Sequence, residues 1–165
     1  MEMDARPSAF ETIVYGGLAI GVLDFFDATL FFGLYGGLPF ERLWQGVAAG
    51  LLGSDSARAG GWNTAILGMF LHFTVALSIA TVYFGIVRLI PILLQHPIIS
   101  GLVYGIAAHL VMKYIVVPLS AIGLVAPYTL SNFLNSMIGH AVLVGLPVAL
   151  IASWSAKRRS PRVAA

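Results

Sequence analysis

Two aspartates lie in the middle of an apolar stretch near the start of the chain. Asp24 and Asp27 belong to residues 20–37, IGVLDFFDATLFFGLYGG, which contain no basic residue. A charged side chain at mid-membrane costs at least ~2.5–3.5 kcal/mol on insertion scales, so it persists only when it is paired, neutralised, bound to a metal or hydrated. The two carboxyl groups therefore need partners from other parts of the chain.

The composition is that of an integral membrane protein. Of 165 residues, 59% are hydrophobic and 10% are charged, which is too apolar for a soluble domain with a charged surface. About 20 apolar residues cross the hydrocarbon core of a bilayer. We predict an all-α fold, a bundle of four transmembrane helices at about 13–37, 64–89, 97–120 and 131–154. The chain has no cysteine, which excludes disulfides and thiolate metal ligands.

Residues 39–52 predict one more helix. Apolar residues recur there at helical spacing after Pro39, namely Phe40, Leu43, Trp44, Val47 and Leu51. This spacing predicts an amphipathic helix that lies at the outer membrane interface. We expect a single transmembrane domain over residues 13–156, between tails of residues 1–12 and 157–165.

The basic residues predict the orientation. Lys157, Arg158, Arg159 and Arg162 follow the last apolar stretch, and the excess of Lys and Arg in cytoplasmic segments places this tail in the cytoplasm. With four spans the N-terminus is cytoplasmic too. The first apolar stretch lacks a cleavage site, so we expect it to be a retained helix and no signal peptide. Anionic lipid is a sufficient partner for the tail, and a net charge of +2 gives no indication of nucleic acid binding.

Four polar side chains fall at one depth in the proposed spans. Asp27 precedes Gly37 by ten residues, and His72, His109 and His140 lie eight or nine residues from the outer ends of their spans. At about 1.5 Å per residue all four are roughly 12–15 Å below the outer boundary, each on a different helix. Asp24 lies about one turn deeper, and Lys113 lies one turn above His109.

Small residues indicate which helix faces pack. Asp24 follows Gly17 and Gly21 on one face of its helix, and His72 follows Gly68 on another. Small residues at four-residue spacing let helices approach closely in lipid. We therefore expect Asp24 and His72 to lie on packing faces and not on lipid faces.

The favoured interpretation of this polar layer is a transition-metal site for zinc or copper. Imidazole nitrogens and carboxylates are suitable ligands for both ions. We expect Asp27 to bind the metal directly. We expect Asp24 to accept a hydrogen bond from a histidine that binds the metal through its other ring nitrogen. The metal-site residues are then Asp27, His72, His140, Asp24 and His109.

Three other interpretations stay open. Titrating Asp and His side chains could conduct protons or ions. His72 and His140 could be the axial ligands of a b-type haem. The polar layer could also do nothing but fix helix packing in a non-catalytic subunit, which would use its glycine-lined faces to form a homo-oligomer or join a larger membrane complex. No phosphate loop, nucleophile elbow or HExxH pattern is present, so the sequence does not predict an enzyme.

Residues 68–159 resemble the YagU family of bacterial inner-membrane proteins. The features that carry the resemblance are His72, Tyr83, Pro91, Gly101, Gly105, Pro118 and the segment IGHAV around His140. The resemblance implies an inner-membrane location, a shared unit of the last three helices, and His72 and His140 as the matching histidines. It implies no biochemical activity, and the two aspartates and His109 depart from the family pattern.

Overall fold

The described part of the chain is entirely helical. The structure is a computed structural model that describes residues 6–123 and 129–159, and no strand occurs among these residues. Four helices are long and apolar enough to cross a membrane: Glu11–Tyr35, Gly61–Leu89, Pro97–Leu119 and Leu130–Arg159. The prediction of an all-α fold with four such helices is confirmed. The predicted and observed bounds of these helices differ most at the end of the last helix, which is expected to end at about residue 154 and continues to Arg159. Arg162 and part of the expected outer connection lie outside the described residues.

Three of the long helices contain π-helical turns. The first consists of η1 (Glu11–Tyr15), α1 (Gly16–Ala28) and η2 (Thr29–Tyr35). The second, α4 (Gly61–Leu89), is regular and is followed by the short 3₁₀ helix η3 (Pro91–Leu94). The third is formed by α5 (Pro97–Val111), η4 (Met112–Val116) and α6 (Val117–Leu119). The fourth is formed by α7 (Leu130–Gly139), η5 (His140–Gly145) and α8 (Leu146–Arg159). Such π turns occur frequently at functional sites.

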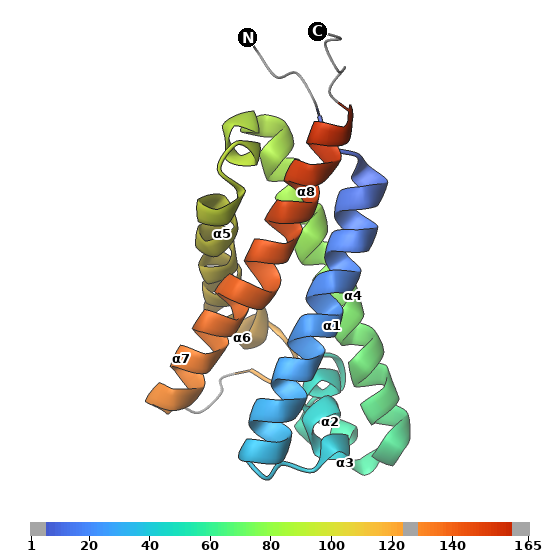
Figure 1. Cartoon of the computed structure of the whole chain (residues 1–165). Coiled ribbons are helices and arrows are strands. Elements are labelled where there is room, and N and C mark those ends of the chain that lie inside the picture. Colours follow the sequence, from blue (N-terminus) through green and yellow to red (C-terminus); the bar gives the residue numbers. More distant parts are fainter. Residues whose placement is uncertain (1–5, 124–128, 160–165) are drawn as a thin grey trace, which may run out of the picture.

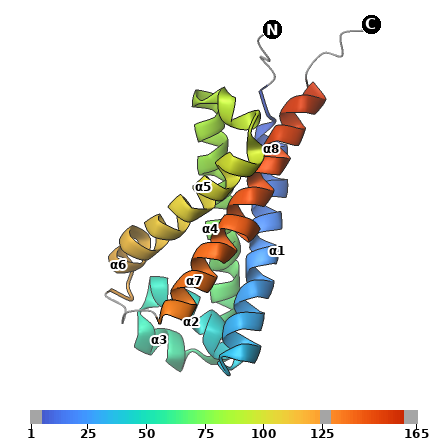
Figure 2. The ribbon, with the colours of Figure 1, turned by 60° about the vertical axis from the view of Figure 1, so that its left-hand side comes forward.

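The two ends of the molecule differ in structure. The start of the first helix and the end of α8 lie together at one end, as Figure 1 shows. The opposite end carries two shorter helices, α2 (Phe40–Leu52) and α3 (Ser54–Ala59), which connect the first long helix to α4. Helix α1 packs on α4, α8 and η5, and α5 packs on η5 and α8. Toward the α2–α3 end, α5 and α6 diverge from α4 (Figure 2).

Glycines allow the closest helix crossings. A Cβ atom on Gly101 would lie 2.9 Å from the Cα of Leu146, and one on Gly105 would lie 2.6 Å from the Cα of Ala141. In the first helix, a Cβ on Gly17 would lie 2.6 Å from the Cδ2 of Leu77. The small-residue faces that the sequence offers for oligomer contacts are thus used for packing within the chain.

Helix α2 directs part of its apolar face into the protein. Trp44 is 1% exposed and its ring stacks on that of Phe25, with centroids 4.3 Å apart. Gly68 of α4 lies so close to the backbone of Trp44 that no side chain would fit between them. Phe40 and Leu51, at the ends of the same face, stay exposed. The predicted helix therefore exists and packs on α4.

Candidate functional site

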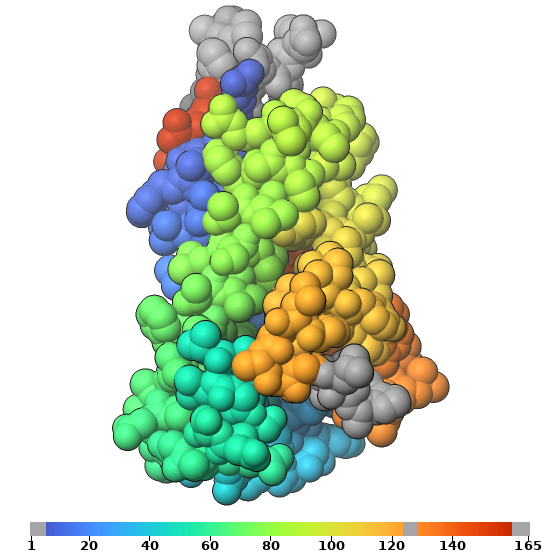
Figure 3. All heavy atoms as spheres, turned by 180° about the vertical axis from the view of Figure 1, so that it is seen from behind, coloured from blue at the N-terminus to red at the C-terminus, as the bar shows by residue number. Residues whose placement is uncertain are grey.

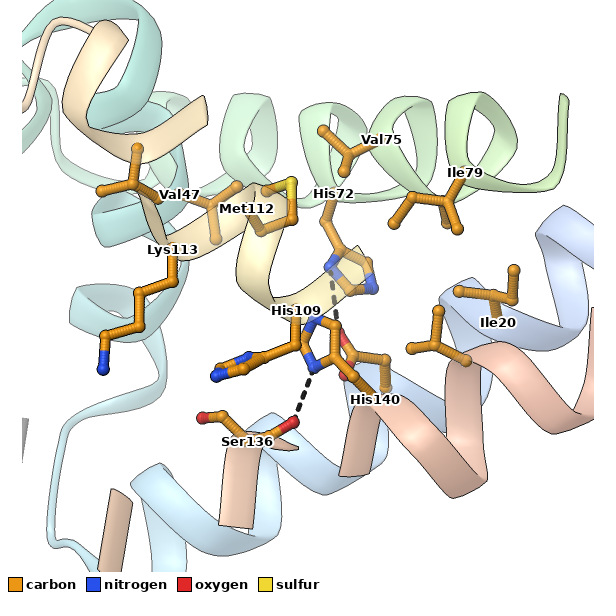
Figure 4. Close-up of a pocket in the computed structure, with 14 residues that line it drawn as sticks. Ile20, Val47, His72, Val75, Ile79, His109, Met112, Lys113, Ser136 and His140 are labelled. Atoms are coloured by element: carbon orange, nitrogen blue, oxygen red, sulfur yellow. Dashed lines mark hydrogen bonds and ion pairs between the residues drawn. The ribbon is translucent and has the colours of Figure 1, made fainter. Parts of the chain in front are cut away.

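One cavity brings most of the predicted polar layer together. It has a volume of about 230 Å³ and lies between the four long helices and α2 (Figure 4). Its polar lining consists of Asp24, His72, His109, Lys113, Ser136 and His140. From behind, the surface is hollowed between α4 in green, α2 in teal and the segment near residue 115 in orange (Figure 3). One carboxyl group, three imidazoles and one ammonium group therefore share a space that could hold water.

His72 is held between a backbone carbonyl and a carboxylate. Its Nε2 atom lies 2.9 Å from the carbonyl oxygen of Gly21. A carbonyl oxygen can only accept a hydrogen bond, so Nε2 carries a proton and donates it. The other ring nitrogen, Nδ1, lies 3.9 Å from Oδ2 of Asp24, which is longer than a hydrogen bond. Gly21 and Asp24 lie on one face of α1, and α4 brings His72 to that face.

The free ring nitrogen of His72 faces the carboxyl group of Asp24. With Nε2 protonated, the neutral ring directs the lone pair of Nδ1 toward the carboxylate, and two acceptors then face each other. A proton on either group turns this repulsion into attraction. The two groups are therefore placed so that a proton could bridge an imidazole and a carboxyl group.

Aromatic rings hold His72 in this orientation. Its ring centroid lies 5.2 Å from that of Trp44 and 5.4 Å from that of Phe73, both edge to face. Sequence reasoning did not identify this packing, because it depends on how α2 docks against α4. The only sequence indication is the helical spacing that places Trp44 on the apolar face of α2.

His140 has the opposite ring nitrogen attached to the backbone. Its Nδ1 atom lies 2.9 Å from the carbonyl oxygen of Ser136, one turn earlier in α7. Nδ1 is therefore the donor, and Nε2 is left as the acceptor nitrogen in the neutral ring. His140 is the first residue of the π-helical segment η5, and Lys113 lies in the π-helical segment η4. Two polar residues of the cavity thus come from irregular turns.

His109 is the most deeply buried of the three histidines. It is 3% exposed, and its Nε2 atom has no hydrogen-bond partner among the residues that the structure describes. Its ring lies edge to face with that of His140, with centroids 5.1 Å apart. Lys113, one turn further along the chain, places its Nζ atom 4.2 Å from the centroid of the Phe133 ring. A buried, unpartnered nitrogen next to a cavity is a position where water or an ion would bind.

Asp27 lies outside the cavity lining. Its Oδ2 atom accepts a hydrogen bond of 3.3 Å from the side-chain amide of Asn135, and the carboxyl group packs against Gly139. The structure thus brings Asp24, and not Asp27, to within 4 Å of an imidazole nitrogen. The roles predicted for the two carboxylates, Asp27 as the direct ligand and Asp24 as the supporting group, stay predictions. Depth along a helix put Asp27 level with the histidines, but rotation about the helix directs it toward α7.

The arrangement differs from a preformed metal site. No group of three or more His, Asp or Glu side chains within residues 6–123 and 129–159 is arranged to hold a metal ion. His72 would have to release the carbonyl of Gly21 to bind a metal through Nε2. A volume of about 230 Å³ is also smaller than the ~300–1,000 Å³ of ordinary ligand pockets.

Comparison with known protein families, with characterised proteins and with solved structures finds no match for this chain. The resemblance to the YagU family therefore stays a prediction.

Proposed function

We propose that this chain is a multi-pass protein of the bacterial inner membrane that binds and transfers protons at an intramembrane cavity. The observation that carries the proposal is the shared cavity, lined by Asp24, His72, His109 and His140 from all four long helices. Imidazole is the side chain whose ordinary titration falls between pH 5 and 8, so it exchanges protons with water near neutral pH. Polar residues that face a cavity inside a membrane domain are typical of proton pathways.

The tautomers support a role in proton exchange. His72 and His140 each attach one ring N–H to a backbone carbonyl. Each ring keeps its other nitrogen as the acceptor atom, which takes up a second proton to form the imidazolium ion. The backbone bonds fix the rings, so proton exchange needs no rotation of either histidine.

The cavity is closed toward the end of the molecule where the chain termini lie. Ile20 and Val144 line the cavity and are 2% and 1% exposed, and Val148 behind them is fully buried. We call these three side chains the apolar plug. The polar side chains that line the cavity are not part of it. We therefore expect proton transfer across the membrane to require a movement of α1 against η5. A gated mechanism is favoured over a constantly open channel.

We also propose an orientation. Lys157, Arg158 and Arg159 are exposed at the end of α8, which favours the cytoplasm for the end of the molecule that carries both termini. Helices α2 and α3 then lie on the outer side. There Phe40 and Leu51 are the exposed apolar residues available to the membrane interface.

Proton flux in reconstituted vesicles tests the proposal. A pH-sensitive dye inside the vesicles reports acidification after an external pH step. We expect the wild-type protein to carry a flux above that of protein-free vesicles, and Asp24→Asn to abolish it because the amide cannot share a proton with His72. Asp27→Asn is the matched control, on the same helix and outside the cavity, and should keep the flux. Equal fluxes in wild type and Asp24→Asn would refute the proposal.

A zinc or copper site is a second candidate. The unpartnered Nε2 atom of His109 favours it, since this buried nitrogen could bind a cation. Calorimetric titration of Zn²⁺ into the purified protein and into His109→Gln distinguishes the two functions. Stoichiometric binding that is lost in the variant would support the metal site, whereas the proton proposal expects no such binding.

A further inference from the structure

A second, larger cavity lies at the α2–α3 end of the molecule. It has a volume of about 600 Å³ and shares no lining residue with the central cavity. The residues of its lining that matter here are Leu38, Arg42, Gln45, Ser54, Arg58 and Ile122. None of the residues that line it is acidic. The cavity therefore presents two guanidinium groups and no carboxylate.

A buried amide orients Arg42. Gln45 is 2% exposed, and its Nε2 atom donates to the carbonyl of Gly61 over 2.9 Å and to the carboxylate of Glu41 over 3.2 Å. These bonds fix the amide so that its oxygen accepts a hydrogen bond of 3.0 Å from Nη1 of Arg42. A guanidinium group has five N–H donors, so most of those of Arg42 are left for a ligand. Glu41 holds this network together and does not line the cavity.

Arg58 faces the same space from α3. It is exposed and makes no hydrogen bond or ion pair with any residue of 6–123 or 129–159. Gly53, with φ of 78°, forms the turn that sets α3 against α2. The backbone N–H of Ala121 donates to the carbonyl of Gly50 over 2.9 Å, which ties the segment around Ile122 to α2. The two arginines are thus presented by separate helices within a connected backbone frame.

We propose that Arg42 and Arg58 bind a phosphate group in this cavity. A guanidinium group pairs with phosphate oxygens through two parallel hydrogen bonds, and phosphate has enough oxygens for two such groups. The hydroxyl group of Ser54 adds a further donor, and Leu38 and Ile122 provide apolar walls. The phosphate comes from either a phospholipid headgroup of the adjacent leaflet or free phosphate. The site is independent of the proton function proposed above.

Two titrations of the full-length protein in a neutral detergent test this site. Inorganic phosphate is the first ligand, and dihexanoylphosphatidylglycerol is the second. Calorimetry measures the affinity of each for the wild-type protein, Arg42→Gln and Arg58→Gln. We expect each substitution to weaken binding about tenfold or more, because it removes charge-assisted hydrogen bonds. Arg88→Gln is the control, since Arg88 lies against Phe84 at the other end of α4 and should not affect binding.

The outcomes separate the two sources of phosphate. Binding of the phospholipid alone supports a headgroup site, and binding of inorganic phosphate, alone or with the lipid, supports recognition of the phosphate itself. Binding of neither ligand overturns the proposal, as does unchanged affinity in both cavity variants or an equal loss in Arg88→Gln. If Arg42→Gln fails to fold because Gln45 loses its partner, Arg58→Gln decides alone, since Arg58 supports no other described residue. Circular dichroism checks folding of each variant.

Discussion

Asp24 and Asp27 lie three residues apart on the first helix and have different partners. Asp24 lies 3.9 Å from His72 and lines the central cavity, whereas Asp27 is hydrogen-bonded to Asn135. Both are half-buried carboxyl groups on the first helix. Asp24 is the one within 4 Å of an imidazole nitrogen, so we expect the two residues to respond differently to the same substitution.

The apolar plug gives a prediction for a single residue. Val144→Ala removes two methyl groups from a side chain that separates the cavity from the terminal end, so water should reach further and passive proton flux should rise. Val142→Ala is the matched control, because Val142 lies in the same segment η5 and is 43% exposed. Flux in vesicles measures both variants. Two results would show that Val144 does not separate the cavity from the terminal end: an unchanged proton flux in Val144→Ala, or an equal increase in flux in Val142→Ala.

The sequence predicts the depth of the polar residues better than their direction. A fixed rise per residue brings His72, His109 and His140 to one level, and all three line one cavity. The direction of a side chain depends on the rotation of its helix and on the neighbouring helices. The spacing of residues within one helix does not give this information. For this reason the sequence places Asp27 level with the histidines but cannot place it beside Asn135. The carbonyl partners of His72 and His140 are also set by packing and local backbone geometry.

The contact between α5 and η5 is the element on which the position of His140 depends. Gly105 and Gly145 meet backbone to backbone, and a Cβ on Gly105 would collide with the carbonyl of His140. Since backbone atoms cannot move aside as a flexible side chain does, even one methyl group must separate the two helices. The crossing therefore fixes both the packing and one wall of the cavity.

Alanine substitutions at two glycines test this crossing. Gly105→Ala should lower the free energy of unfolding by about 1–3 kcal/mol, as overpacking does elsewhere. Gly85→Ala has open space around its new methyl group and should be neutral or slightly stabilising. Both changes alter helix propensity alike, so their difference measures the crossing. Unfolding in mixed micelles provides the values, and equal stabilities would contradict the close approach.

Sequence spacing predicts the existence of elements but not all of their contacts. The four apolar stretches and the helix after Pro39 are evident because their length and periodicity are local properties. The π-helical turns at Met112–Val116 and His140–Gly145 carry no local pattern that we could identify. The packing of Trp44 on Phe25 joins elements distant in the sequence, which periodicity alone does not relate.

The whole molecule has two chemically different ends. One end carries Lys157, Arg158 and Arg159, and the other carries α2, α3 and the cavity with Arg42 and Arg58. In membrane proteins the Lys and Arg excess near the ends of the spans sets orientation, and the last turn of α8 has the denser cluster of basic residues. The proposed orientation therefore depends on the basic end of α8.

Reporter fusions test this orientation. A reporter that is active only in the cytoplasm should be active at the C-terminus, and one inserted after Gly60 should be inactive. Replacing Lys157, Arg158 and Arg159 together by Gln should weaken this preference. Activity after Gly60 and none at the C-terminus would reverse the orientation and place the phosphate-binding cavity in the cytoplasm.

The ring tautomers of the histidines test the central claim most directly. Nitrogen-15 NMR of histidine-labelled protein in bilayers, above pH 7, distinguishes the two neutral tautomers. The structure predicts a proton on Nε2 of His72 and on Nδ1 of His140, with the exposed His96 as an internal reference. Asp24→Asn should shift the signals of His72 and leave those of His96 unchanged. A mixture of tautomers in both rings would contradict a shared proton site in the cavity. Signals of His72 that are unchanged in Asp24→Asn would contradict it too.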